Sequence, residues 1–228
     1  CALPISGYAG RSYPFDGNDP LAYASGGFLW DYAIARNKTV KVYGEYAPAN
    51  RLPATVRHGL LERWQKGDDF TKDWTAKSPI PGLDKVLVRN FPSYSTAIPD
   101  VARAQIFISD LRKAEQEGKF SNLVLIQLPS DHTYGAAPGV SSAKAMVADN
   151  DLALGQIVEA LSTSRFWPKM AIFVIEDDAQ NGVDHVDGHR TVAMAISPYS
   201  RRGHVDSTFY STQSMVKTIE LILGLPTM

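Results

Sequence analysis

Acidic and histidine side chains gather in one short stretch of this sequence, residues 176–191. The groups in it that can bind a metal or move a proton are Asp177, Asp178, Asp184, His185, Asp187 and His189. Carboxylates this close repel one another unless a cation or protons neutralise them, and neutral imidazoles complete a mixed oxygen and nitrogen ligand set. The spacing indicates a bound metal, and the alternative is a polar surface loop whose acids are solvated.

A second group of the same chemistry lies upstream, at Asp131 and His132. It follows the apolar run 123–128, just as the acidic loop follows the apolar run 171–175. In sheets of parallel strands, ligands gather outside the carboxyl ends of the strands. We therefore expect both groups to meet at one sheet edge, and this second group is what favours a metal over a solvated loop.

Two known motifs with similar spacing are excluded. A calcium loop of the EF-hand type that begins at Asp177 would need Asp or Asn at position 179 and Glu at position 188, where this chain has Ala179 and Gly188. The two histidines of the loop are spaced as in a zinc-protease helix, but Val186 occupies the place of the general base.

Hydrophobic periodicity predicts helices that alternate with strands. Helices are expected over 28–36, 99–118, 149–161 and 211–224, and strands over 40–46, 122–128, 169–175 and 191–196. Asp149 or Asn150 is expected to cap the third helix. Residues 47–97 show no clear repeat and are expected to form short helices and loops around the site, with His58 solvated or packed. The alternation predicts an α/β fold, a mostly parallel sheet with helices on both faces.

Composition is that of an ordinary globular protein. Hydrophobic residues make up 44% of the 228-residue chain, charged residues make up 21%, and the net charge is -1. This charge favours no nucleic-acid partner, and no apolar run is long enough to span a membrane. Cys1 stands where an initiator Met is expected. We expect residues 1–7 to be non-native or disordered and residues 8–228 to form one partial domain.

Several blocks of the sequence resemble the alkaline phosphatase superfamily. The blocks are LPSDHT at 128–133, EDDAQNGVDHVDGHRT at 176–191, SPYSRRG at 197–203 and YSTQSMVKTIELILGLP at 210–226. The chain is most similar to the bacterial phosphoesterase family, which includes phospholipase C-like and acid phosphatase-like enzymes and domains fused behind a β-propeller. The resemblance runs from about residue 26 to the end of the chain, as the C-terminal portion of such a domain.

The resemblance implies a set of metal ligands. Asp177 and Asp178 match the adjacent ligands that follow a strand, and Asp131 with His132 matches the other metal segment. His185 matches the last metal-binding histidine. His189 is its rival for that place, or a substrate-binding group. The implied cofactor is one or two divalent ions, zinc or manganese.

The resemblance also implies that the domain is incomplete at its N-terminus. Family members begin with a strand, an acidic ligand and a Ser or Thr nucleophile, so the nucleophile is expected upstream of this chain. Ser130 and Thr133 are the hydroxyls next to the proposed ligands, and Leu128 stands where the superfamily usually has an Asp. Arg201 and Arg202 either approach an anionic substrate or remain solvated.

The activity that the resemblance implies is metal-dependent hydrolysis of phosphate esters, with low activity for this chain alone. The parent protein is expected to be exported or periplasmic, and an upstream β-propeller is an expected neighbour. The alternatives are a domain that binds a metal or ligand without catalysis, or a relative of sulfatases or phosphoglycerate mutases.

Overall fold

The structure, a computed structural model, describes residues 23–177 and 190–228. The chain is α/β and divides into two compact units. The larger unit is the described part of Phe15–Ser164, and the smaller unit is the described part of Arg165–Thr227. No helix of the described residues is both long and apolar enough to cross a membrane.

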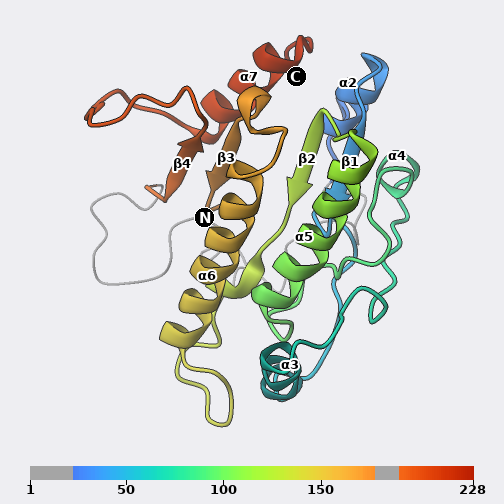
Figure 1. The fold of residues 1–228 in the computed structure, drawn as a ribbon, viewed down its shortest axis with the longest axis vertical. Coiled ribbons are helices and arrows are strands. Elements are labelled where there is room, and N and C mark those ends of the chain that lie inside the picture. Colours follow the sequence, from blue (N-terminus) through green and yellow to red (C-terminus); the bar gives the residue numbers. More distant parts are fainter. Residues whose placement is uncertain (1–22, 178–189) are drawn as a thin grey trace, which may run out of the picture. The chain divides into compact units, whose positions relative to one another are not determined.

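The larger unit contains two parallel strands and several helices (Figure 1). Its elements are α2 (Leu29–Ala35), β1 (Val40–Tyr43), α3 (Val56–Gln65), α4 (Pro81–Asp84), α5 (Asp100–Glu117), β2 (Leu123–Ile126), the 3-10 turn η2 (Pro129–Asp131) and α6 (Ala143–Ser162). The predicted helices over 28–36 and 99–118 and the predicted strands over 40–46 and 122–128 are confirmed, with shorter strands than expected. The predicted short helices within 47–97 are also present.

Strands β1 and β2 pair in parallel, with Val40 opposite Leu123 and Tyr43 opposite Ile126. Their carboxyl ends therefore lie at the same edge, where a parallel sheet places its ligands. Gly44 ends β1 with a φ of 80°, and a Cβ there would lie 2.7 Å from the carbonyl oxygen of Pro92. A glycine is needed at this point because the chain both turns into a left-handed conformation and approaches another backbone closely.

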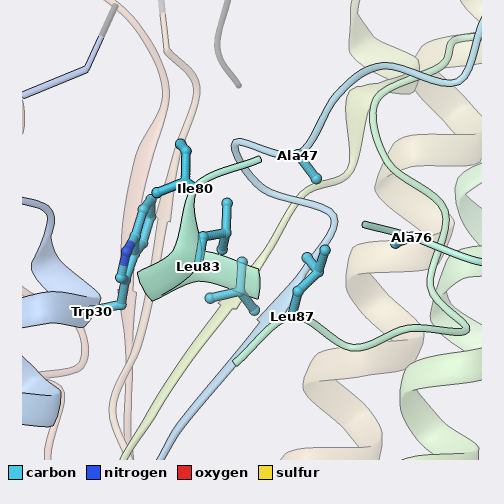
Figure 2. Packing of buried hydrophobic residues seen from close by; sticks show 7 residues of the cluster. Trp30, Ala47, Ala76, Ile80, Leu83 and Leu87 are labelled. Atoms are coloured by element: carbon cyan, nitrogen blue, oxygen red, sulfur yellow. The ribbon is translucent and has the colours of Figure 1, made fainter. Parts of the chain in front are cut away.

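The core of the larger unit forms where α2 and α4 pack beside β1 (Figure 2). Its fully or nearly buried residues are Trp30, Val42, Ala47, Ala76, Ile80, Leu83 and Leu87. The ring of Phe28 stacks on that of Trp30 with centroids 4.4 Å apart. Residues from the irregular segment 47–97 thus complete the apolar face that the short strand cannot bury by itself.

The long helices α5 and α6 pack against each other (Figure 1). Helix α5 ends at the left-handed Gly118, as its sequence predicts. Helix α6 begins earlier than expected, because the Ser142 hydroxyl accepts the N–H of Ala145 and caps it. The predicted cap at Asp149 or Asn150 is wrong: both residues lie inside the helix.

The smaller unit contains η3 (Trp167–Lys169), β3 (Ile172–Ile175), β4 (Ala193–Ile196) and α7 (Thr212–Leu223). The predicted strands and the C-terminal helix are confirmed, and Ser211 with Ser214 forms a capping box at the start of α7. Strands β3 and β4 are antiparallel, with Ile172 opposite Ile196. The described residues therefore form one parallel and one antiparallel pair of strands, and the expected larger parallel sheet is not seen in them.

Candidate functional site

The loop that carries Asp131 and His132 leaves the carboxyl end of β2. The N–H of Gln127 donates to the carbonyl of Tyr43 at 3.0 Å, which extends the pairing of β2 with β1 by one bond. The chain then turns through η2, and the N–H of His132 donates to the carbonyl of Pro129 at 3.2 Å. The sequence prediction that this segment begins at a strand end is confirmed.

Ser130 anchors this loop to the helices. The residue is completely buried, and its hydroxyl donates to Oδ2 of Asp149 at 2.8 Å. The same hydroxyl accepts a hydrogen bond from Arg57 at 3.1 Å, and the Ser130 N–H donates to Oδ2 of Asp100 at 2.9 Å. Ser130 is therefore a structural anchor, and its hydroxyl is not accessible to a substrate.

The side chain of His132 is exposed, whereas Ser130, two residues earlier, is buried. Its ring meets the ring of Tyr94 edge to face, with centroids 6.0 Å apart and planes at 89°. Within the described residues, the imidazole nitrogens make no hydrogen bond and no ion pair. The ring is thus held on one side by an aromatic contact while its nitrogens stay available to a ligand.

The neighbours of His132 offer an acid and a hydroxyl. Asp131, the last residue of η2, is partly buried. The Thr133 hydroxyl accepts the N–H of Gly135 at 3.1 Å in a local turn. Asp131 and His132 are adjacent in the chain and belong to one loop, so the structure keeps this predicted pair together.

The second predicted segment leaves the carboxyl end of β3. The N–H of Glu176 donates to the carbonyl of Val192 at 3.0 Å, and the hydroxyl of Thr191 donates to the Glu176 carboxylate at 2.9 Å. These two bonds close the base of the acidic loop. Asp177 follows and is exposed.

The predicted ligands Asp178 and His185, and the rival His189, lie outside the described residues. Of the ligands that are described, Asp131 and His132 belong to the larger unit and Asp177 to the smaller one. Among the described residues, no group of three or more His, Cys, Asp or Glu side chains is placed to hold a metal ion. The convergence of the two segments on one edge stays a prediction.

The other residues singled out in the sequence lie on the surface. The side chain of His58 is 85% exposed and pairs with Glu62, one turn away on α3, at 3.2 Å. Arg201 and Arg202 are exposed in the smaller unit. His58 is therefore solvated, and the exposure of Arg201 and Arg202 leaves both of their alternatives open.

The amino ends of β1 and β2 border a polar hollow of about 320 Å³. Its lining includes Lys41, Tyr43, Asp110 and Lys113. Lys41 and the Tyr43 hydroxyl both donate to Oδ2 of Asp110, at 3.1 and 3.0 Å. Burial raises the pKa of Tyr43 well above its usual value, and the neighbouring Asp110 carboxylate raises it further. None of the residues that line this hollow belongs to the His132 loop, so the hollow is separate from the candidate site.

A known protein family matches most of this chain. The family model described as Phosphoesterase family matches residues 69–226. The chain belongs to the Phosphoesterase family. The match includes β2, the His132 loop, β3 and Asp177, and it supports hydrolysis of a phosphate ester as the reaction class.

No curated protein matches this chain, and no solved structure matches it either. The assignment to the family therefore stands on the match over residues 69–226.

Local patterns in the sequence do not reveal the buried charges that hold the His132 loop. Arg57 and Arg103 stand out by no motif, and the sequence places Asp149 at a helix cap. A signal was present for Asp149. It stands three residues after the buried Met146 and four before the buried Ala153, on the apolar stripe of its helix.

Proposed function

We propose that this chain carries part of a metal-dependent phosphoesterase site in which the His132 loop supplies ligands. The observation that carries the proposal is the exposed imidazole of His132, which follows Asp131 at a parallel strand end and makes no hydrogen bond within the described residues. The Ser130 hydroxyl, two residues earlier, is by contrast buried and bonded within the fold, so the imidazole is the group of this segment that a ligand can reach.

The donor chemistry of the proposed ligands suits a divalent transition metal. Carboxylate oxygens and imidazole nitrogens form the mixed set that zinc or manganese accepts. The proposed ligands are Asp131, His132, Asp177, Asp178 and His185, with His189 as the alternative to His185. A divalent ion held by such groups would polarise the phosphoryl oxygens and lower the pKa of an attacking hydroxyl.

The attacking hydroxyl is not assigned to a described residue of this loop. Ser130 is buried and bonded on its donor and acceptor sides, which removes one of the two hydroxyls next to the proposed ligands. The proposal therefore keeps the nucleophile upstream, in a domain of the alkaline phosphatase superfamily with a larger parallel sheet. An upstream β-propeller and an exported or periplasmic location belong to the same proposal.

Metal analysis combined with an assay tests the proposal. The 228-residue chain and an upstream-extended chain are loaded with zinc or manganese, their bound metal is measured, and both are assayed with an aryl phosphate. We expect His132→Gln and Asp177→Asn to lower the metal content of both chains, because each removes a ligand. We expect only the extended chain to turn over rapidly.

A surface histidine provides the matched control. His58→Gln removes an exposed imidazole of the larger unit and should leave the metal content unchanged. Unchanged metal content in both ligand variants would overturn the proposed site. Bound metal without turnover in the extended chain would instead select the alternative of a non-catalytic binding domain.

A further inference from the structure

Four charged side chains form a buried charge cluster next to the His132 loop. They are Arg57 of α3, Asp100 and Arg103 of α5, and Asp149 of α6, and none is more than 8% exposed. Two positive charges balance two negative ones. The free-energy cost of removing ions from water often exceeds the gain from their mutual attraction. The presence of the cluster therefore does not by itself show that it stabilises the fold. What it does provide is fixed geometry for the groups that it binds.

The aspartates of the cluster bind backbone N–H groups. Oδ2 of Asp149 accepts the N–H of Asp100 at 2.7 Å, and its Oδ1 accepts the N–H of Val101 at 3.2 Å. These N–H groups have no partner within α5, so Asp149 caps that helix from α6. Asp100 in turn accepts the Ser130 N–H. The start of α5 and the His132 loop are thereby tied to the same carboxylates.

Asn150 adds a bond at the beginning of the loop. Its side-chain NH₂ donates to the carbonyl of Leu128 at 2.8 Å and to Oδ2 of Asp100 at 3.0 Å. The loop is therefore held at both Leu128 and Ser130, the two residues that flank the first residue of η2.

The arginines of the cluster bind carbonyl oxygens of the segment 93–98. Arg103 donates to three of them, those of Ser93, Ser95 and Ile98, at 2.8, 3.3 and 2.6 Å. Arg57 donates to the carbonyl of Thr96 at 2.8 Å. This segment contains Tyr94, the residue whose ring contacts His132.

We propose that the buried charge cluster positions the His132 imidazole, with Ser130 and Asn150 as positioning residues. The cluster fixes the loop from which the ring projects and also the segment whose Tyr94 packs against that ring. Because the imidazole makes no polar contact with the described residues, these two backbone supports are what orient it. The functional meaning of this orientation rests on the proposed metal site.

Side-chain NMR of His132, followed by a zinc titration, tests the inference. The His132 ring signals are assigned by their loss in His132→Gln, and the nuclear Overhauser contact between the Tyr94 and His132 rings is measured without metal. We expect Ser130→Ala and Asn150→Ala each to shift the His132 signals and weaken this contact. Both should also weaken zinc binding by roughly tenfold or more, as loss of a ligand-orienting partner does.

Tyr43→Phe is the control for a general loss of stability. It removes another hydroxyl that donates to a carboxylate of the same unit, that of Asp110, which is outside the buried charge cluster. It should leave the ring contact and the zinc affinity at the wild-type level.

Two other results are informative. An unchanged ring contact and unchanged zinc affinity in folded Ser130→Ala and Asn150→Ala would overturn the inference, because the cluster would then only stabilise the fold. A wild-type chain that binds no zinc, but whose ring contact still depends on Ser130 and Asn150, would overturn the proposed metal site and support the positioning role.

Discussion

Two arginine–aspartate pairs of the larger unit have nearly the same length but different surroundings. Arg57 and Asp149 are 2.7 Å apart, with 2% and 7% of their side chains exposed. Arg89 and Asp84 are 2.6 Å apart, with 49% and 36% exposed. Distance alone would rank the two pairs as equal. Burial makes the two pairs differ in energy. Water screens the attraction between Arg89 and Asp84, and it can hydrate either side chain if the other is removed.

The two pairs also differ in what else they bind. Asp149 accepts hydrogen bonds from the start of α5 and from Ser130, so it connects three parts of the unit. Asp84 accepts from Arg89 and from the N–H of Ser78, six residues away. The buried pair therefore organises tertiary structure near the candidate site, whereas the exposed pair reinforces one local turn.

The largest expected effect is the loss of Asp149. Asp149→Ala removes the carboxylate that neutralises the buried Arg57 and that accepts hydrogen bonds from the Ser130 hydroxyl and two N–H groups of α5. We expect the free energy of unfolding to fall by about 3–5 kcal/mol, measured by urea denaturation. Asp151→Ala is the control, because Asp151 lies two residues away on the exposed side of the same helix. Equal losses in the two variants would show that burial is not the cause.

The next effect is the coupling within each pair. In a double-mutant cycle with Arg57→Ala and Asp149→Ala, the double variant should lose roughly 2 kcal/mol less than the two single losses added together. The reason is that each single variant leaves one buried charge of the pair without its counter-ion, whereas the double variant removes both charges. The cycle of Arg89→Ala and Asp84→Ala should be additive. Additivity in both cycles would remove the distinction between the pairs.

A smaller effect should appear in the pH dependence of stability. Burial, together with the nearby Asp149 charge, raises the pKa of Asp100 from its usual 3.8 to about 6, against the opposing effects of Arg103, the Ser130 N–H and Asn150. Between these two values the folded chain retains a proton that the unfolded chain has lost. The free energy of unfolding should therefore fall as pH rises through this window.

The Asp100→Asn variant isolates that contribution. The difference between wild type and variant, measured by urea unfolding from pH 4 to pH 7, should decrease as pH rises to about 6 and then level off. A difference that grows with pH would show that the arginines dominate and keep the carboxylate charged.

The smallest effect is expected at the exposed pair. The hydrogen bond from Arg89, together with the N–H of Ser78, lowers the pKa of Asp84 to about 2. Any stability from this carboxylate is present above its usual pKa of 3.8 and is lost as pH falls toward about 2. At neutral pH and physiological salt, Asp84→Asn should leave the thermal midpoint unchanged. A large loss that persists in 0.5 M salt would contradict screening as the explanation.

Local patterns in the sequence predicted most of the secondary structure. The apolar steps of α5, the serine cap of α7 and the glycines that end both helices are signals within a few residues of one another. Such signals predict structure well because helix periodicity and capping depend on neighbours in the chain. The strand ends that lead to Asp131 and Asp177 were predicted for the same reason.

The family, the order of the elements and the position of Asp131 and His132 at a strand end all follow from the sequence. Which polar groups are buried, and what they bind, depends on how the helices and strands pack. The sequence places Asp149 at the start of its own helix. In the structure it instead caps α5, where it accepts the N–H of Asp100, 49 residues earlier in the chain. Ser130 is a hydroxyl residue next to the proposed ligands in the sequence, and only the folded chain shows that it is buried and bonded to residues of three helices. Such roles depend on groups that folding brings together, and no local pattern in the chain records that proximity.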